Sequence, residues 1–227
     1  MRANLLTRQR EITRLEGFSD AVFGFALTLL VVSLEVPRTY AELMDTMRGF
    51  GAFAVCFAIV SWIWYERNLF FRRYGLQDGY TILLNLVLLF VVLFYVYPLK
   101  FVFTMLLGDV FGGPQPIAPV TVVSGAPLML IYSLAVLVLF VIFALLYWHA
   151  LRHRAELELG KLDVFDARTG AMRHLLTAAV ALISILIALI VPRQSAFAGM
   201  IYFVLGPLHG AYGFMRGRTR DRLAAAG

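Results

Sequence analysis

Four candidate functional residues, Arg14, Phe18, Ser19 and Asp20, lie at the start of a long apolar run near the N-terminus. Ionised side chains at the start of a membrane span are costly and rarely accidental. Because a polar group held away from water needs a partner, Asp20 and Ser19 are expected to join this segment to neighbouring helices. We therefore predict that these polar residues form structural hydrogen bonds between helices rather than take part in a reaction.

The sequence motifs of enzymes and of resident metals are missing. The chain contains no phosphate-binding glycine loop, no G-x-S-x-G, no H-E-x-x-H and no C-x-x-C, so it is not expected to be an enzyme. His149 and His153 have a helical spacing that would suit a metal ion, but no third ligand lies nearby in sequence. We therefore expect them to be interfacial polar residues.

An α-helix turns by about 100° per residue, so the face that each side chain occupies follows from its number. One stripe, about 100° wide, contains Arg14, Phe18, Ala21, Phe25, Thr28, Leu29 and Val32. Asp20 projects about 240° from Arg14. Its level in the membrane matches residues 64–68 and Asn85, which are its candidate partners. Asp20 should thus face neighbouring protein, while Phe25, Thr28, Leu29 and Val32 face a common axis in an oligomer.

Each of these assignments has an ordinary alternative. Phe, Leu and Val at helical spacing are packing residues in most membrane helices. The hydroxyl of a membrane threonine such as Thr28 usually donates to the carbonyl of the preceding turn. For Asn85, a buried hydrogen bond between helices is favoured over any contact with an ion.

Composition shows what kind of fold must position these residues. The chain has 227 residues, of which 61% are hydrophobic and 15% charged, with a mean hydropathy of +0.80. A membrane helix needs about 20 apolar residues. Six segments qualify, over about 12–36, 49–70, 80–103, 128–151, 175–191 and 197–215. Because these runs do not alternate as barrel strands do, we predict an all-α integral membrane protein with six transmembrane helices in one domain, 1–227.

Lysines and arginines gather on one side of this six-span arrangement. They precede the first span, follow the second, separate the fourth from the fifth and end the chain, whereas the other side has Arg38, Arg48, Lys100 and Arg193. The positive-inside rule places both termini in the cytoplasm, with the chain in the lipid bilayer of a cell membrane. The net charge of +6 then follows from topology, so nucleic acid is not an expected partner.

The pattern Arg14-x-x-x-Phe18-Ser19-Asp20, followed by an apolar run with Thr28, resembles the transmembrane protein 175 family of potassium channels. Leu84-Asn85-Leu86 and the later Pro98 are similar to the third span of that family. The resemblance implies a homotetramer of six-span subunits whose first spans line a central pore, without the carbonyl filter loop of ordinary potassium channels. Relatives tend to have His near the inner end of span 2, where this chain has residues 64–67, and a smaller residue at Phe25.

The expected function is a passive potassium-permeable cation channel with a narrow apolar constriction. Partial dehydration costs K⁺ less than Na⁺, and closure of the same ring stops flow by dewetting. The permeant K⁺ passes through the pore, with no bound cofactor or resident metal. The alternative is a secondary transporter or proton-conducting protein, for which ionisable residues near the middle of several spans and an inverted repeat are expected.

Overall fold

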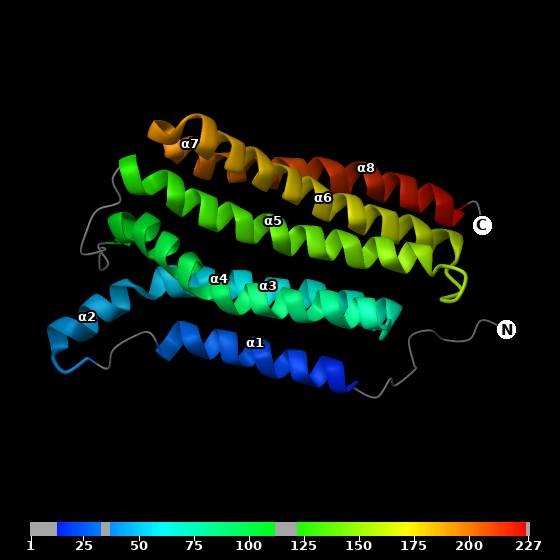
Figure 1. Cartoon of the computed structure of the whole chain (residues 1–227), viewed down its shortest axis with the longest axis horizontal. Coiled ribbons are helices and arrows are strands. Elements are labelled where there is room, and N and C mark those ends of the chain that lie inside the picture. The colour runs from blue at the N-terminus through cyan, green and yellow to red at the C-terminus, as the bar shows by residue number, and fades with distance from the viewer. Residues whose placement is uncertain (1–12, 33–36, 112–121, 226–227) are drawn as a thin grey trace.

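The computed structural model describes residues 13–32, 37–111 and 122–225, and every regular element within them is helical (Figure 1). The elements in chain order are α1 (Arg14–Val32), α2 (Tyr40–Arg48), α3 (Phe50–Tyr74), α4 (Gly79–Phe111), α5 (Val122–Arg152), α6 (Lys161–Ile190), the 3₁₀ turn η1 (Pro192–Gln194), α7 (Ser195–Met200), the 3₁₀ turn η2 (Ile201–Val204) and α8 (Leu205–Ala225). The predicted limits of the first span, at Ile12 and Val36, lie outside the described residues.

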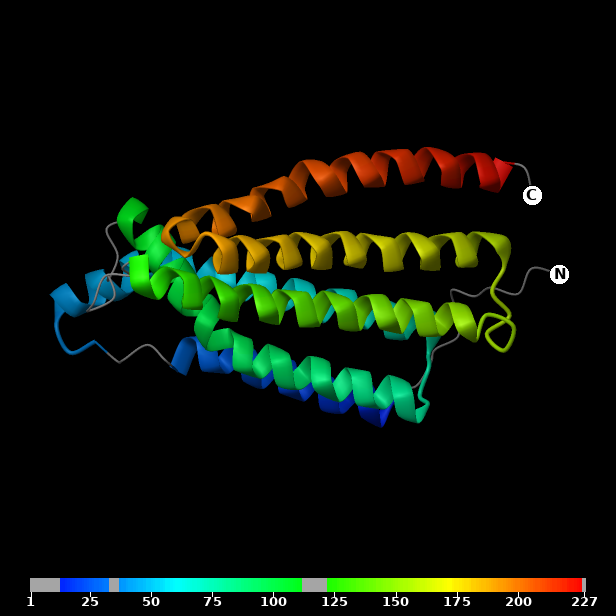
Figure 2. The same cartoon turned by 45° about the horizontal axis from the view of Figure 1, so that its top comes forward.

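The long helices run alongside one another in an elongated bundle. Helices α1, α4 and α6 run in one direction, and α3, α5 and α8 run in the other, so that α1 begins and α8 ends at the same end of the bundle (Figures 1 and 2). Helix α1 packs on α3 and α4 at one edge, while α8 packs on α6 at the opposite edge. Because α1 lies at an edge, the other described helices leave one of its faces uncovered.

Apolar length identifies three of the described helices as membrane spans, over 79–107, 125–152 and 161–190. A fourth is added if α2 and α3, bent by 43° at their junction, form one span. Helices α1 and α8 are not among these spans. Arg14, Glu16 and Asp20 occupy the first turns of α1, and four arginines follow Met215 in α8. The predicted all-helical membrane class is confirmed, and the count of six remains a prediction.

Several helices differ from the spans predicted for them. Helix α4 continues to Phe111 rather than ending near 103, and α5 begins at Val122 rather than near 128. Helix α6 begins at Lys161, well before the apolar segment at 175, because its polar first turns pair with other helices: Asp166 bonds to Arg73 at 2.8 Å and to Arg220 at 2.9 Å. The predicted last span is interrupted by the 3₁₀ turn η2. Pro207 lacks a backbone N–H, and its ring crowds the carbonyl four residues earlier, which explains the break.

Glycine permits two close features of the bundle. Gly75 ends α3 in the left-handed region, with φ of 59°, and its N–H donates to Phe71 O at 2.9 Å. Asp78 then caps α4 by accepting the N–H and hydroxyl of Thr81. Where α6 crosses α5, a Cβ on Gly170 would lie 2.5 Å from the Tyr147 ring. Only glycine lets these two helices approach so closely.

Candidate functional site

A capping box fixes the start of α1. The backbone N–H of Thr13 donates to Glu16 Oε2 at 2.9 Å, and the N–H of Glu16 donates to Thr13 Oγ1 at 3.2 Å. These bonds satisfy two of the donors that a helix N-terminus leaves free. The cap holds the first turn directly before the residues of the predicted motif.

Ser19 faces the interior of the bundle and is fully buried. Its Oγ donates to Leu15 O at 2.7 Å and accepts a hydrogen bond from Asn85 Nδ2, on α4, at 3.0 Å. Asn85 is also fully buried, and its Oδ1 accepts from Arg67 Nε, on α3, at 2.8 Å. A chain of hydrogen bonds therefore joins α1, α4 and α3 at one level.

Arg67 is the centre of this network. By sequence it groups with the basic residues that follow span 2, and it also falls within the range 64–68 of candidate partners for Asp20. Its side chain is 1% exposed and lies inside α3 rather than beyond it. Besides Asn85, it reaches Leu15 O at 3.4 Å and lies over the Phe71 ring at 4.5 Å. Arg67 lies inside the predicted span 49–70, and a charged residue at such a position indicates a buried polar contact. Counting Arg67 with the cytoplasmic basic residues obscured that indication.

Asp20 extends the network towards the surface. Its Oδ1 accepts the indole N–H of Trp64 at 2.9 Å and lies 3.8 Å from Arg67 Nη1. The carboxylate is 48% exposed, whereas Arg67 is enclosed. The motif acid is thus held at the margin between the packed and the open face of α1.

The opposite face of α1 is not covered by any other part of the chain that the structure describes. Phe18 is 53% exposed and Phe25 58% exposed, while Phe23 on the packed side is 2% exposed. Exposed neighbours of these two phenylalanines are Arg14, Gly17, Ala21, Gly24 and Thr28. A Cβ added to either glycine would meet nothing within 4 Å. The open face is therefore built largely from small and apolar side chains, with Arg14 at its start.

The other predicted pore-lining residues, Thr28, Leu29 and Val32, do not all lie on this face. Leu29 is partly buried and packs against the core cluster, at the shoulder of the open face. The side chain of Val32 lies outside the described part of the chain. Thr28 Oγ1 donates to Gly24 O at 2.9 Å, as its alternative interpretation expected. Because the hydroxyl hydrogen points back along the helix, the oxygen lone pairs are still able to accept or to face a cation.

The histidines considered as metal ligands make other contacts. His149 Nε2 lies 3.1 Å from Asp78 Oδ2, and His153 Nδ1 lies 2.9 Å from Glu156 Oε2. Within the described residues, no group of three or more His, Cys, Asp or Glu side chains is arranged to hold a metal ion. The site is instead an anchored helix with one open apolar face.

These features define a polytopic all-helical membrane protein whose first helix is fixed on one side and open on the other. The family model for the endosomal/lysosomal potassium channel TMEM175 matches residues 14–95, which contain the whole network. A potassium channel of Marivirga tractuosa is 38% identical over 232 residues, covering 97% of this chain and 94% of that protein. The chain therefore belongs to the TMEM175 family of potassium channels.

Solved structures agree with this assignment. A variant of the potassium channel MtTMEM175, crystallised with a nanobody–MBP fusion protein, has a TM-score of 0.83 and 37% sequence identity, covering 96% of this chain and 99% of that chain. A lysosomal potassium-selective channel TMEM175 homologue from Chamaesiphon minutus has a TM-score of 0.52 at 24% identity, covering 87% of this chain and 99% of that chain. The second likeness supports the fold alone.

Proposed function

We propose that four copies of this chain form a passive potassium-permeable channel in the cell membrane, with the open face of α1 lining the pore. The observation that carries the proposal is the division of α1 into an anchored and an uncovered face. Ser19 and Asp20 fix the helix to α3 and α4, so the face with Phe25 is held in one direction. A fixed apolar face on an edge helix is suited to meeting copies of itself around an axis.

The constriction is proposed at Phe25, with Thr28, Leu29 and Val32 one or two turns further along. A ring of apolar side chains makes an ion shed part of its water, which costs K⁺ less than Na⁺. The Thr28 oxygen supplies one acceptor beside this ring. In this proposal K⁺ is the permeant ion, no cofactor is needed, and the lipid bilayer and three other copies of the chain are the partners.

The proposed topology has six spans and both termini in the cytoplasm. Its support is the position of the basic residues. Arg14 at the start of α1, Arg73 near the end of α3, Arg152 at the end of α5 and Arg222 near the end of α8 all lie towards one end of the bundle. The positive-inside rule makes this the cytoplasmic end.

Flux measurement on purified protein in liposomes tests the proposed function. We expect K⁺ to move down its gradient faster than Na⁺ without a second coupled ion, in a preparation that crosslinks as a tetramer. Net K⁺ movement that requires a proton or Na⁺ gradient would indicate a secondary transporter instead. Conduction by a monomeric preparation would contradict the proposal, because the proposed pore forms on the axis between four copies.

A further inference from the structure

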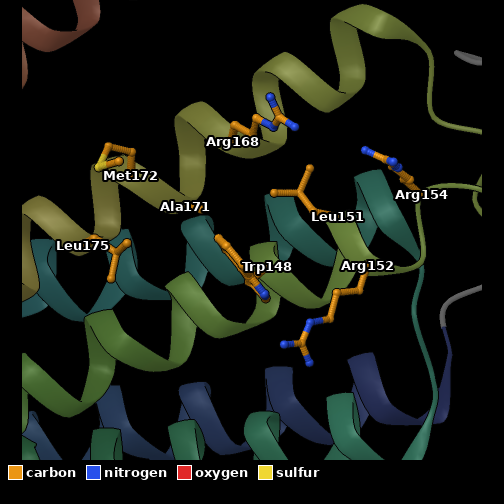
Figure 3. A pocket seen from close by; sticks show the side chains of 8 residues that line it. All are labelled: Trp148, Leu151, Arg152, Arg154, Arg168, Ala171, Met172 and Leu175. Carbon is orange, nitrogen blue, oxygen red and sulfur yellow. The ribbon is translucent and has the colours of Figure 1, made fainter.

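A pocket lies at the cytoplasmic end of the bundle, on helices that do not form the proposed pore. It has a volume of about 490 Å³ and opens between the end of α5 and the first half of α6 (Figure 3). Its apolar wall includes Trp148 and Leu151 on α5, with Met172 and Leu175 on α6. Trp148 is 54% exposed, so the wall is accessible within one chain.

The pocket changes from basic to apolar along the bundle axis. Arg168 lies one turn nearer the start of α6 than Met172, and Arg154 lies just beyond the end of α5. In Figure 3 the arginines lie towards the end of the bundle, and Leu175 lies at the opposite side of the pocket. A basic mouth therefore opens over an apolar wall that continues into the proposed membrane region.

The arginines of the pocket differ from three other arginines at this end of the bundle. Arg73, Arg173 and Arg220 each pair with a carboxylate, of Asp163, Asp166 or Glu66. Among the described residues, no carboxylate pairs with Arg152, Arg154 or Arg168, which also make no other recorded polar contact. Their charge is left without an internal counter-ion, and this favours an anionic ligand from outside.

We propose that this pocket binds an anionic phospholipid of the cytoplasmic leaflet. The phosphate group accepts hydrogen bonds from Arg154 and Arg168, since guanidinium groups bind phosphate in bidentate geometry. An acyl chain lies along Met172 and Leu175, which are 47% and 43% exposed. Trp148 occupies the interfacial level that tryptophan prefers in membranes. Charge and apolar surface together select a charged lipid over a soluble anion and over a zwitterionic lipid.

Native mass spectrometry of the purified, assembled protein tests this site through lipid retention, which does not depend on whether the protein conducts. Phosphatidylglycerol and phosphatidylcholine are added separately, and the bound fraction of each is measured. We expect phosphatidylglycerol to bind more tightly to the parent protein. Arg154→Gln and Arg168→Gln should each weaken its binding about fivefold, since a basic residue near an anionic lipid surface contributes roughly that factor.

Two further variants separate the parts of the site. Arg222→Gln removes an exposed arginine of α8 at the same end of the bundle and should leave lipid retention unchanged. Met172→Trp keeps the arginines but fills the apolar wall, and it should lower phosphatidylglycerol retention. The proposal is overturned if phosphatidylcholine binds equally well, or if Arg222→Gln has the same effect as Arg168→Gln. Displacement of the lipid by an equal concentration of inorganic phosphate, or loss of the oligomer in Met172→Trp, would also overturn it.

Discussion

Replacing Asn85 by Leu is expected to weaken the attachment of α1 more than any other conservative change in this region. Asn85 is fully buried and makes two side-chain hydrogen bonds, accepting from Arg67 Nε at 2.8 Å and donating to Ser19 Oγ at 3.0 Å. Leu has a similar volume but neither group. The substitution therefore leaves the buried guanidinium with Leu15 O at 3.4 Å and Asp20 at 3.8 Å as its nearest remaining oxygen partners.

The size of the effect follows from these two bonds. Hydrogen bonds between membrane helices average about 0.6 kcal/mol and reach about 1.7 kcal/mol. Bonds to charged groups are the stronger ones, at about 1.5–3 kcal/mol in soluble proteins. We expect Asn85→Leu to lower the free energy of unfolding by about 1–2.5 kcal/mol. Ser19→Ala removes only one of the two bonds and should cost about 0.6 kcal/mol.

The assay is unfolding of the purified protein by SDS titration in mixed micelles, followed by the loss of helical signal. Asn68→Leu is the matched control, because Asn68 is half-buried on α3 and has no recorded side-chain hydrogen bond among the described residues. Its effect should stay below about 0.5 kcal/mol. Equal losses for Asn85→Leu and Asn68→Leu would refute the role assigned to the network.

Three other predictions concern different parts of the chain. Asp20→Ala should lower the yield of assembled protein on size exclusion; normal yield with altered K⁺ to Na⁺ selectivity would argue that Asp20 meets the permeating ion. Gly170→Ala should destabilise the bundle by about 1–3 kcal/mol in the same SDS assay, because the added methyl overlaps a buried tyrosine ring, whereas Gly206→Ala, with open space around it, should not. Partial burial raises the pKa of Asp78, but the interactions with Thr81 and His149 together outweigh it and lower this pKa from 3.8 to about 2. The stability that Asp78 contributes is then present above about pH 4 and lost as pH falls towards 2. Asp78→Asn keeps the helix cap but cannot ionise, so it should lose less stability over this range than the parent protein. Equal losses in the two proteins would contradict the assignment.

Helix geometry was sufficient to separate the two faces of α1. The spacing of the motif set Asp20 at the level of residues 64–68, and in the structure it accepts a hydrogen bond from Trp64. The same geometry grouped Phe18 with Phe25, and both are exposed on one side. These relations depend only on the regular turn of a helix, which the sequence defines completely.

Other features that depend on several helices at once were not predicted from the sequence. Charge counting treated Arg67 as a cytoplasmic residue, because nothing local indicates that Asn85, eighteen positions further along the chain, accepts its hydrogen bond. Hydropathy located the apolar part of α6 but not its start at Lys161, since the first turns are stabilised by arginines of α3 and α8. Charge counting and hydropathy consider one segment at a time, so neither method could detect these pairings.

The most direct test of the proposed pore is the current carried by Phe25→Ala, assembled as a normal tetramer in liposomes. Phe25 is a large side chain on the open face of α1, 58% exposed in the single chain. Four alanines in its place would widen and wet the constriction, so conductance should rise and the K⁺ to Na⁺ permeability ratio should fall. Thr28→Val, which keeps the shape and deletes the oxygen, should lower selectivity with little gain in conductance. An unchanged current and an unchanged permeability ratio in Phe25→Ala would contradict the assignment of the pore to this face.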